Sequence, residues 1–298
     1  MDKPFHSKNA SPGAGVAPGA LYVVATPIGN LEDITLRALR ILKEVDVIAA
    51  EGVGHTRKLC SYFGIQTPLT AYNQHNHKRK GPAILERLRS GEDVALVSNA
   101  GTPGISDPGT MLVGGAMDEG IPVSPVPGPC AAAAALSASG LRSDGFLFAG
   151  FLSSRKGRRL NELASLAAER RTLVFYEAPH RIMAALGDMI EALGDRQAVV
   201  AREMTKLHEE ILRGSLSDIA RDMDSRPARG ELTVVVEGGP SGPSRADEDP
   251  GLQAKAKDLL EKGMGVRDAA AKLSLEYKAG YRHIYRVCLS MKKSMRTY

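Results

Sequence analysis

The chain has 298 residues, of which 43% are hydrophobic and 24% charged, a balance typical of a globular protein with one large domain or two ordinary ones. No apolar run approaches the roughly 20 residues of a membrane-spanning helix, and the three cysteines lie far apart, so a membrane span, a disulfide framework and a bound metal are not expected. The net charge of +5 is modest evidence for a polyanionic partner, and a slightly basic enzyme fits it equally well.

Residues 1–19 have the composition of a disordered leader. They are polar, rich in Pro, Gly and Ala, and lack the apolar core of a secretory signal. Together with the cysteine usage, this indicates a cytoplasmic protein.

Residues 20–127 alternate short apolar runs with helical patterns, which predicts an α/β domain with a largely parallel sheet. The helix that starts near residue 107 is expected to have Asp107 as its N-cap. The basic stretch 75–80 is expected on a mobile loop. Strands are predicted at 21–25, 47–50, 94–98 and 121–126, and helices at 34–45, 56–63 and 107–120. Because the strand at 121–126 contains prolines, it is expected at an edge of the sheet.

Residues 128–240 form a second α/β set, followed by a linker at 241–251 and a helical module at 252–298. The pattern of the last module fits a helix-turn-helix-like unit with a basic final helix, or a small helical cap. In the second set, strands are predicted at 146–149, 172–176, 198–201, 210–213 and 232–237, and helices at 130–139, 161–168, 181–193 and 216–223.

Four turns at strand ends are unusually rich in Gly, Ala and Pro, at 26–30, 51–54, 99–104 and 127–131. Small residues let the backbone approach a ligand, and ligands of open α/β sheets bind beyond the carboxyl ends of strands. Four such turns favour a ligand site over mere chain reversals. None matches the dinucleotide or P-loop fingerprint, so neither of those enzyme classes is supported.

Several longer segments resemble one known family, in the same order along the chain. They read LYVVATPIGNLEDITLRALRILKEVDVIAAE, HTRKL, VALVSNAGTPGISDPG, PGPCAAAAALSASGL, FLFAGFL, LVFYEAPHRI, AREMTKLHEEILRGSL and GELTVVVEG. Over about residues 20–240 the chain is similar to the ribosomal RNA 2′-O-methyltransferase I family of the tetrapyrrole-methylase superfamily. The resemblance implies a two-domain α/β fold of the tetrapyrrole-methylase type (class III S-adenosylmethionine methyltransferases) with a small C-terminal helical module.

The same resemblance implies a homodimer that binds S-adenosylmethionine between its two α/β domains. The implied substrate is a cytidine ribose in the decoding region of 16S rRNA, within the small ribosomal subunit. The implied cofactor contacts are Pro27, Asn99, Ala100, Gly101, Ile105, Cys130, Ala131, Tyr176, Ala201, Gly230, Glu231 and Thr233.

Methyl transfer from a sulfonium to a hydroxyl requires in-line alignment and removal of a proton. Lys206 serves as a base if its pKa is lowered, or otherwise stabilises alkoxide charge. Turn capping explains Glu177 equally well, and a surface charge run is the alternative for Glu203 and Lys206. The catalytic candidates are Glu51, Glu177, Arg202, Glu203 and Lys206, with His55, His180 and His208 as further possible bases.

RNA affinity rests largely on neutralising phosphates. For Arg57 and Lys58 a solvated helix face is the simpler interpretation. The candidates for RNA contact are His55, Arg57, Lys58, His75, Lys78, Arg79 and Arg181.

Two motifs depart from the family. The chain has EGVG at 51–54 where the family has EDTR, and SNAG at 98–101 where it has SDAG. If the Asp that the family has at position 99 accepts a hydrogen bond from the cofactor, its replacement by Asn99 weakens cofactor binding by about 1.5–3 kcal/mol. Three hypotheses follow: an active ribose methyltransferase, a catalytically weakened ribosome-binding relative, and a methyltransferase for a tetrapyrrole or a protein side chain.

Overall fold

The structure is a computed structural model that describes residues 17–224, 230–239, 250–277 and 281–294. The chain divides into two compact units, Met1–Gly239 and Pro240–Tyr298. Most of the expected leader and linker lies outside the described residues. Within the described part, no helix is long and apolar enough to cross a membrane.

The first sheet has five parallel strands in the order β3-β2-β4-β1-β5. Its central strands are buried on both faces and uniformly apolar, as strands covered by helices on both sides must be. β5 pairs only with β1, so the strand with Pro125 lies at an edge, as predicted. The strands are β1 Leu21–Val24, β2 Val47–Ala50, β3 Leu69–Ala71, β4 Val94–Val97 and β5 Val123–Val126.

Two pairs of helices cover this sheet, and residues that alternate along each strand face one pair or the other. The first pair is α1 Leu36–Glu44 and α2 Val53–Tyr62, and the second is α3 His77–Arg89 and α4 Thr110–Asp118. Thr35 caps α1 by accepting a hydrogen bond from the Ala38 N–H. A short 3-10 turn, η1 Leu31–Asp33, connects β1 to α1.

The second sheet is mixed, in the order β6-β7-β10-β8-β9, and only β6 and β7 run parallel. β10 lies antiparallel between β7 and β8, and β8 returns directly into β9 through a loop too short for a parallel crossover. The strands are β6 Phe146–Phe151, β7 Thr172–Glu177, β8 Gln197–Arg202, β9 Glu210–Ser215 and β10 Leu232–Val236.

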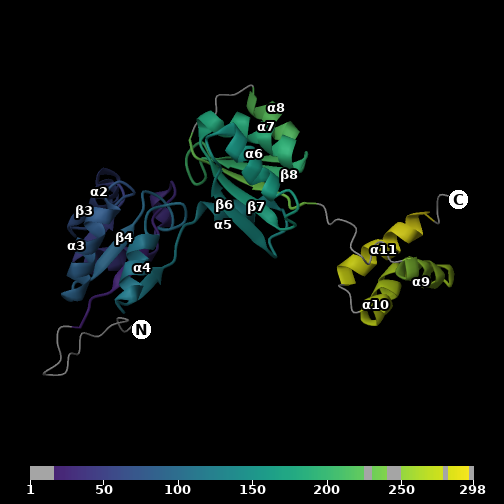
Figure 1. Ribbon diagram of the computed structural model, residues 1–298, viewed down its shortest axis with the longest axis horizontal. Helices are drawn as coiled ribbons and strands as arrows, with labels where there is room; N and C mark the ends of the chain where they lie inside the picture. The colour runs from purple at the N-terminus through teal and green to yellow at the C-terminus, as the bar shows by residue number, and fades with distance from the viewer. Residues whose placement is uncertain (1–16, 225–229, 240–249, 278–280, 295–298) are drawn as a thin grey trace. The chain divides into compact units, whose positions relative to one another are not determined.

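Helices also cover both faces of the second sheet (Figure 1). On one side are α6 Lys156–Ser165, α7 Ile182–Leu193, which follows the short 3-10 turn η2 Pro179–Arg181, and α8 Leu216–Asp224. On the other is α5 Ala131–Ser139. The alanines of α5 let it lie close to the strands, and Ala132 and Ala135 are buried there.

Two local predictions were wrong. α4 begins at Thr110 with Gly109 as its N-cap, so Asp107 does not cap it. Residues 75–80 are not a mobile loop, because α3 begins at His77 and the preceding turn is held by the side chains of Asn73 and Asn76. These Asx-type hydrogen bonds replace the missing helical ones and fix the turn.

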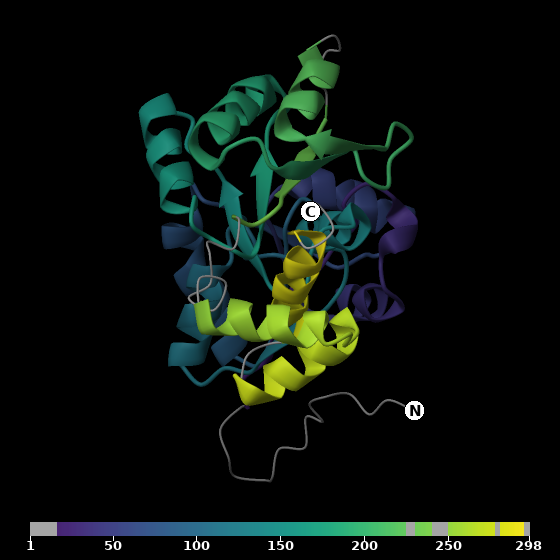
Figure 2. The ribbon, with the colours of Figure 1, turned by 90° about the vertical axis from the view of Figure 1, so that its right-hand side faces the viewer.

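The second unit is a group of three helices, α9 Pro250–Glu261, α10 Val266–Glu276 and α11 Tyr281–Ser294, which cross one another (Figure 2). They share an apolar core of their own that includes Leu252, Leu273 and Ile284. The predicted helical module is therefore present. Whether it acts as a helix-turn-helix unit or as a cap stays a prediction.

Candidate active site

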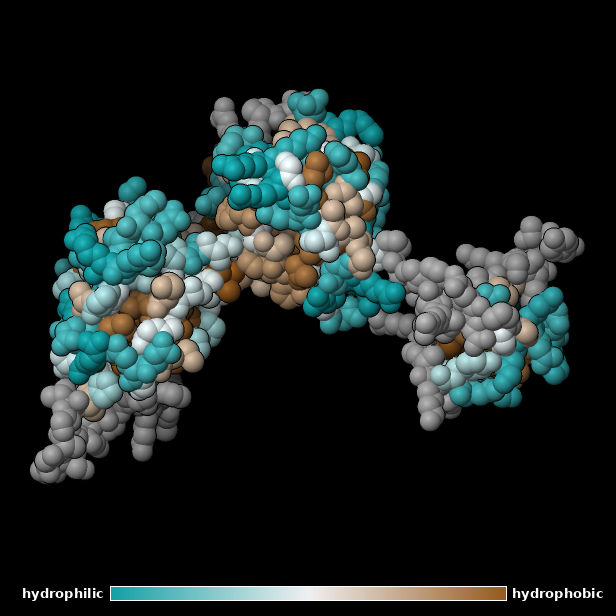
Figure 3. Space-filling model, in the orientation of Figure 1, coloured by the Kyte–Doolittle hydropathy of each residue, from teal (hydrophilic) through white to brown (hydrophobic). Residues whose placement is uncertain are grey.

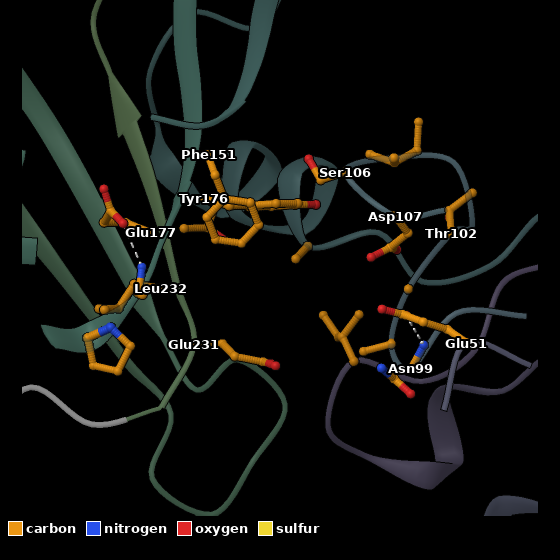
Figure 4. Close-up of a pocket in the computed structure, with 18 residues that line it drawn as sticks. Glu51, Asn99, Thr102, Ser106, Asp107, Phe151, Tyr176, Glu177, Glu231 and Leu232 are labelled. Atoms are coloured by element: carbon orange, nitrogen blue, oxygen red, sulfur yellow. Dashed lines mark hydrogen bonds between the residues drawn. The ribbon is translucent and has the colours of Figure 1, made fainter. Parts of the chain in front are cut away.

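A cavity of about 360 Å³ lies between the strand ends of the first sheet and the ends of β6, β7 and β10 in the second, with the residues next to them. Small-molecule pockets occupy about 300–1,000 Å³, so this one can hold a ligand. Figure 4 shows the residues that surround it. They are Ile28, Glu51, Asn99, Ala100, Gly101, Thr102, Ile105, Ser106, Asp107, Ala131, Phe151, Tyr176, Glu177, Ala178, Pro179, Glu231, Leu232 and Thr233.

The loop after β4 forms one wall of the cavity and is tied to the turn after β1. The Thr26 N–H donates to the Gly101 carbonyl at 2.9 Å, and the Gly101 N–H donates back to Thr26 at 3.0 Å. Gly101 has φ 76, a left-handed conformation that glycine adopts without steric cost. Ser106 adopts φ 67 without that freedom, so backbone strain is stored at the cavity wall.

Four acidic residues line the cavity. Besides Glu177, they are Glu51 and Asp107 on one side and Glu231 on the other (Figure 4). Glu51 Oε2 accepts the Asn99 N–H at 3.0 Å. Burial, aided by the charges of Glu51 and Glu231, raises the pKa of Asp107 to about 6, although the Ser98 hydroxyl acts in the opposite direction. A cationic ligand group would relieve this repulsion.

The opposite end of the cavity is aromatic and apolar. The Tyr176 ring packs edge-on against Phe148 and Phe151, with ring centroids 4.9 and 5.6 Å away. Its hydroxyl accepts the Ala132 N–H at 3.2 Å, in the first turn of α5. Burial raises the pKa of Tyr176, so the phenol stays neutral. The cavity therefore suits a ligand with a cationic part and a flat apolar part.

Glu177 is buried in an ion pair. Its Oε1 lies 3.1 Å from Arg181 Nε and accepts the Ala178 N–H at 2.8 Å. Arg181 also donates to the Leu152 carbonyl. These partners favour the capping interpretation of Glu177 and leave Arg181 largely enclosed rather than presented to RNA.

The loop between β8 and β9 brings charged side chains to the cavity edge. Lys206 Nζ lies 2.8 Å from Glu203 Oε1 and 3.4 Å from Glu231 Oε2. Glu203 and Thr205 have φ of 50° and 66°, strained for non-glycine residues and typical of functional loops. The Asn30 N–H donates to Thr205 Oγ1 at 2.9 Å, which fixes the loop against the turn after β1.

The charge state of Lys206 decides its possible roles. Burial lowers its pKa, but the contacts with Glu203 and Glu231 outweigh burial and raise the pKa above its ordinary value. Lys206 is therefore protonated at neutral pH and cannot act as the general base considered from the sequence. An ammonium at this position can stabilise negative charge.

A second cavity, of about 460 Å³, meets the first at Ile28, Asn99, Ala100 and Glu231. Its other lining residues come from the turn after β1, from α2, from Ser98 after β4 and from Lys206. They are Thr26, Pro27, Gly29, Leu31, His55, Thr56, Lys58, Leu59, Tyr62, Ser98 and Lys206.

Most of the sequence-predicted site residues line one of these cavities, but some do not. Ala201 is buried in the core of the second sheet. Gly230 leaves room for the Glu203 side chain, because a Cβ at position 230 would lie 2.1 Å from it. Cys130 immediately precedes α5. Outside the two linings lie Arg57, His75, Lys78, Arg79, Cys130, Arg181, Ala201, Arg202, Glu203 and Gly230.

Sequence reasoning missed several lining residues. Asp107 was assigned to a helix cap, and its position next to Pro108 gave that assignment its support. The others were ordinary apolar or hydroxyl side chains without a motif of their own. The residues of the first cavity that no prediction covered are Ser106, Asp107, Phe151, Ala178 and Pro179.

Comparisons with known proteins identify the class. Residues 20–220 match the family model of the tetrapyrrole (corrin/porphyrin) methylases. Cobalt precorrin-4 methyltransferase has the same fold, with a TM-score of 0.58 and 19% identity over 73% of this chain and 94% of that one. The uroporphyrin-III C-methyltransferase of Thermus thermophilus, solved with S-adenosyl homocysteine, gives a TM-score of 0.52 and 22% identity over 73% and 97%.

Curated relatives are much closer in sequence. The ribosomal RNA small subunit methyltransferase I of Pseudomonas aeruginosa is 48% identical over 85% of this chain and 90% of its own length. The protein of the same name from Synechocystis is 43% identical over 92% and 98%. The chain therefore belongs to the ribosomal RNA small subunit methyltransferase I family of tetrapyrrole methylases.

Proposed function

We propose that the protein transfers a methyl group from S-adenosylmethionine to the 2′-hydroxyl of a cytidine ribose in the decoding region of 16S rRNA. The observation that carries this proposal is the pair of cavities that meet at Asn99 and Glu231. One is acidic and aromatic, and the other is bordered by cationic side chains. The names of the curated relatives support RNA of the small ribosomal subunit as the substrate.

The first cavity fits S-adenosylmethionine by the chemistry of its lining. The cofactor carries an ammonium and a sulfonium, which suit the carboxyl groups of Glu51, Asp107 and Glu231. Its adenine suits the apolar wall formed by Ile105 and Tyr176. When bound, the cofactor supplies the methyl group.

The chain's own residues would handle the charge and the proton of the acceptor. The ribose hydroxyl loses its proton as its oxygen takes up the methyl group, so negative charge develops on that oxygen. The protonated Lys206 is suited to stabilise this charge, and Glu231, 3.4 Å from it and common to both cavities, is suited to receive the proton. Among the described residues no cluster of three or more metal ligands was found.

Surface hydrophobicity supports the expected homodimer. Phe146 of β6 is 42% exposed, and apolar surface gathers over β6 and α5 (Figure 3). Exposed apolar patches mark interfaces between subunits or with partners. Light scattering on the purified protein measures the oligomeric state. An enzyme that methylates ribosomal subunits would act in the cytoplasm.

Transfer of tritiated methyl groups to purified small ribosomal subunits from a strain lacking the gene tests the proposal. The expected product is one alkali-resistant dinucleotide, because a 2′-O-methyl blocks cleavage at its phosphate. Lys206→Met should lower kcat by about 10²-fold or more with little change in cofactor affinity, and Lys206→Arg should retain part of the rate. A chain that binds subunits but transfers no methyl group would instead be the weakened relative. Label in a tetrapyrrole or a protein would establish the third hypothesis.

A further inference from the structure

We infer that the second cavity is a nucleotide pocket that takes one unstacked nucleotide of the RNA, with its base against the Tyr62 ring. This inference rests on the proposed function and specifies how the substrate is held. Sequence-specific RNA recognition commonly splays a base out of the strand and stacks it on an aromatic side chain. Enzymes that do chemistry on a base likewise take it out of the stack and hold it in a pocket.

The spacing of residues along α2 builds one wall of this nucleotide pocket. His55, Lys58, Leu59 and Tyr62 follow at intervals of three and four, so they lie along one face of the helix. The turn after β1 forms the facing wall, where Gly29 gives the β8–β9 loop room to approach. The wall therefore offers an aromatic ring at one end and cationic groups beside it.

Tyr62 is the anchor that this pocket needs. Tyr62 is 67% exposed, so its ring is accessible to a ligand in the cavity that it lines. The ring is braced edge-on by Phe63 at 4.8 Å, and Phe63 itself packs against the first core. A rigid exposed ring beside a cavity is a platform for the π-face of a base.

Two polar atoms at the pocket are buried without a hydrogen-bond partner in the protein. They are Thr56 Oγ1 and Asn99 Oδ1, and the Thr56 residue is only 2% exposed. An unpaired buried polar atom is costly, so such atoms are expected to gain partners when the site is filled. Hydroxyl and amide groups suit the polar edges of a base or a ribose.

The volume and position of the pocket agree with one nucleotide rather than with an extension of the cofactor. Its exposed hydrogen-bond donors, His55 and Lys58, suit a phosphate, whereas the carboxyl groups of Glu51 and Asp107 belong to the first cavity alone. The two cavities meet at Asn99 and Glu231, where a ribose hydroxyl would face the methyl donor.

Three variants test the pocket: Tyr62→Leu, Tyr62→Phe and Thr56→Val. The probe is the small ribosomal subunit from a strain lacking the gene, with kcat/KM for methyl transfer and the subunit Kd measured together. Tyr62→Leu removes the stacking platform and should lower kcat/KM by about 5- to 150-fold. Tyr62→Phe keeps the ring and should stay within a few-fold of the unmodified chain. Thr56→Val keeps the shape and removes the hydroxyl, so a loss of about 2- to 12-fold is expected.

S-adenosylmethionine affinity, measured by calorimetry, separates the pocket from the cofactor site. It should be unchanged within about two-fold in all three variants. Equal kcat/KM for Tyr62→Leu and the unmodified chain would overturn the nucleotide pocket. If the unmodified chain transfers no methyl group, the proposed function fails. The pocket then stands only if Tyr62→Leu weakens subunit binding while Tyr62→Phe does not.

Discussion

Replacing Asp107 by Asn should stabilise the free protein and weaken its binding of the cofactor. The carboxyl group is partly buried beside Glu51, and its pKa is raised from 3.8 to about 6. Keeping it ionised at pH 7.5 therefore costs folding free energy. Each pKa unit corresponds to 1.36 kcal/mol, and after discounting for solvent screening at this partly exposed group the cost is about 1–2 kcal/mol.

The sign of the pH dependence follows from the raised pKa. Between pH 3.8 and about 6 the folded state holds a proton on Asp107 that the unfolded state releases, so stability falls as the pH rises through this range. The amide that replaces this carboxyl group in Asp107→Asn cannot ionise. The variant should match the unmodified chain near pH 4 and exceed it by about 1–2 kcal/mol at pH 7.5 in urea unfolding.

Cofactor affinity should change in the opposite direction. An ionised Asp107 attracts a cationic ligand, so the Kd of the unmodified chain for S-adenosylmethionine should rise as the pH falls below about 6. Asp107→Asn should bind about 10-fold or more weakly at pH 7.5, the scale of one charge-assisted hydrogen bond, and should lose that pH dependence. Equal stability and equal Kd for both proteins at pH 7.5 would falsify the assignment of Asp107 to the cation site.

Two further predictions concern residues that pack rather than react. Arg159→Met leaves Asp188, its buried partner at 2.6 Å, without a strong counter-ion and should cost about 3–5 kcal/mol in urea unfolding, whereas Arg158→Met, at the exposed neighbouring position, should change little. Gly52→Ala introduces a Cβ that would lie 2.3 Å from Asn99 Oδ1, so it should destabilise the fold more in the presence of Asn99 than in an Asn99→Ala background. A double-mutant cycle by thermal unfolding measures that difference, and a coupling energy near zero would show that the two residues do not share this space.

Much of the first sheet and its helices was predictable because each element has a clear local pattern in the sequence. Continuous apolar runs with turns of Gly and Pro defined β1, β2 and β4, and helical spacing defined α1. β3 and the whole of α3 were missed because β3 has three residues and Pro82 lies inside the helix. Strand direction in the second sheet depends on pairing with β10, the last strand in the sequence, which local patterns do not reveal.

The candidate site was predictable where it is made of strand-end loops and not where it depends on side-chain partners. The loop after β4 and the start of α5 were predicted because parallel strands bring their carboxyl ends together. The roles suggested for Glu177 and Lys206 depended on their ion pairs with Arg181, Glu203 and Glu231. Arg181 and Glu203 are four and three residues away along the chain, but the contacts depend on turn and loop geometry, and Glu231 reaches Lys206 only in the folded chain.

The two departures from the family motifs lie next to each other in the structure. An ideal Cβ at Gly52 would lie 2.3 Å from Asn99 Oδ1, so the side chains at positions 52 and 99 share one space. The cavity also keeps the carboxyl groups of Glu51, Asp107 and Glu231, and a further one at position 99 would add to the charge repulsion that, together with burial, raises the pKa of Asp107. Loss of charge at residue 99 therefore leaves an acidic site for a cation in place. The hypothesis of a weakened relative rested on these departures, and the geometry gives it little support.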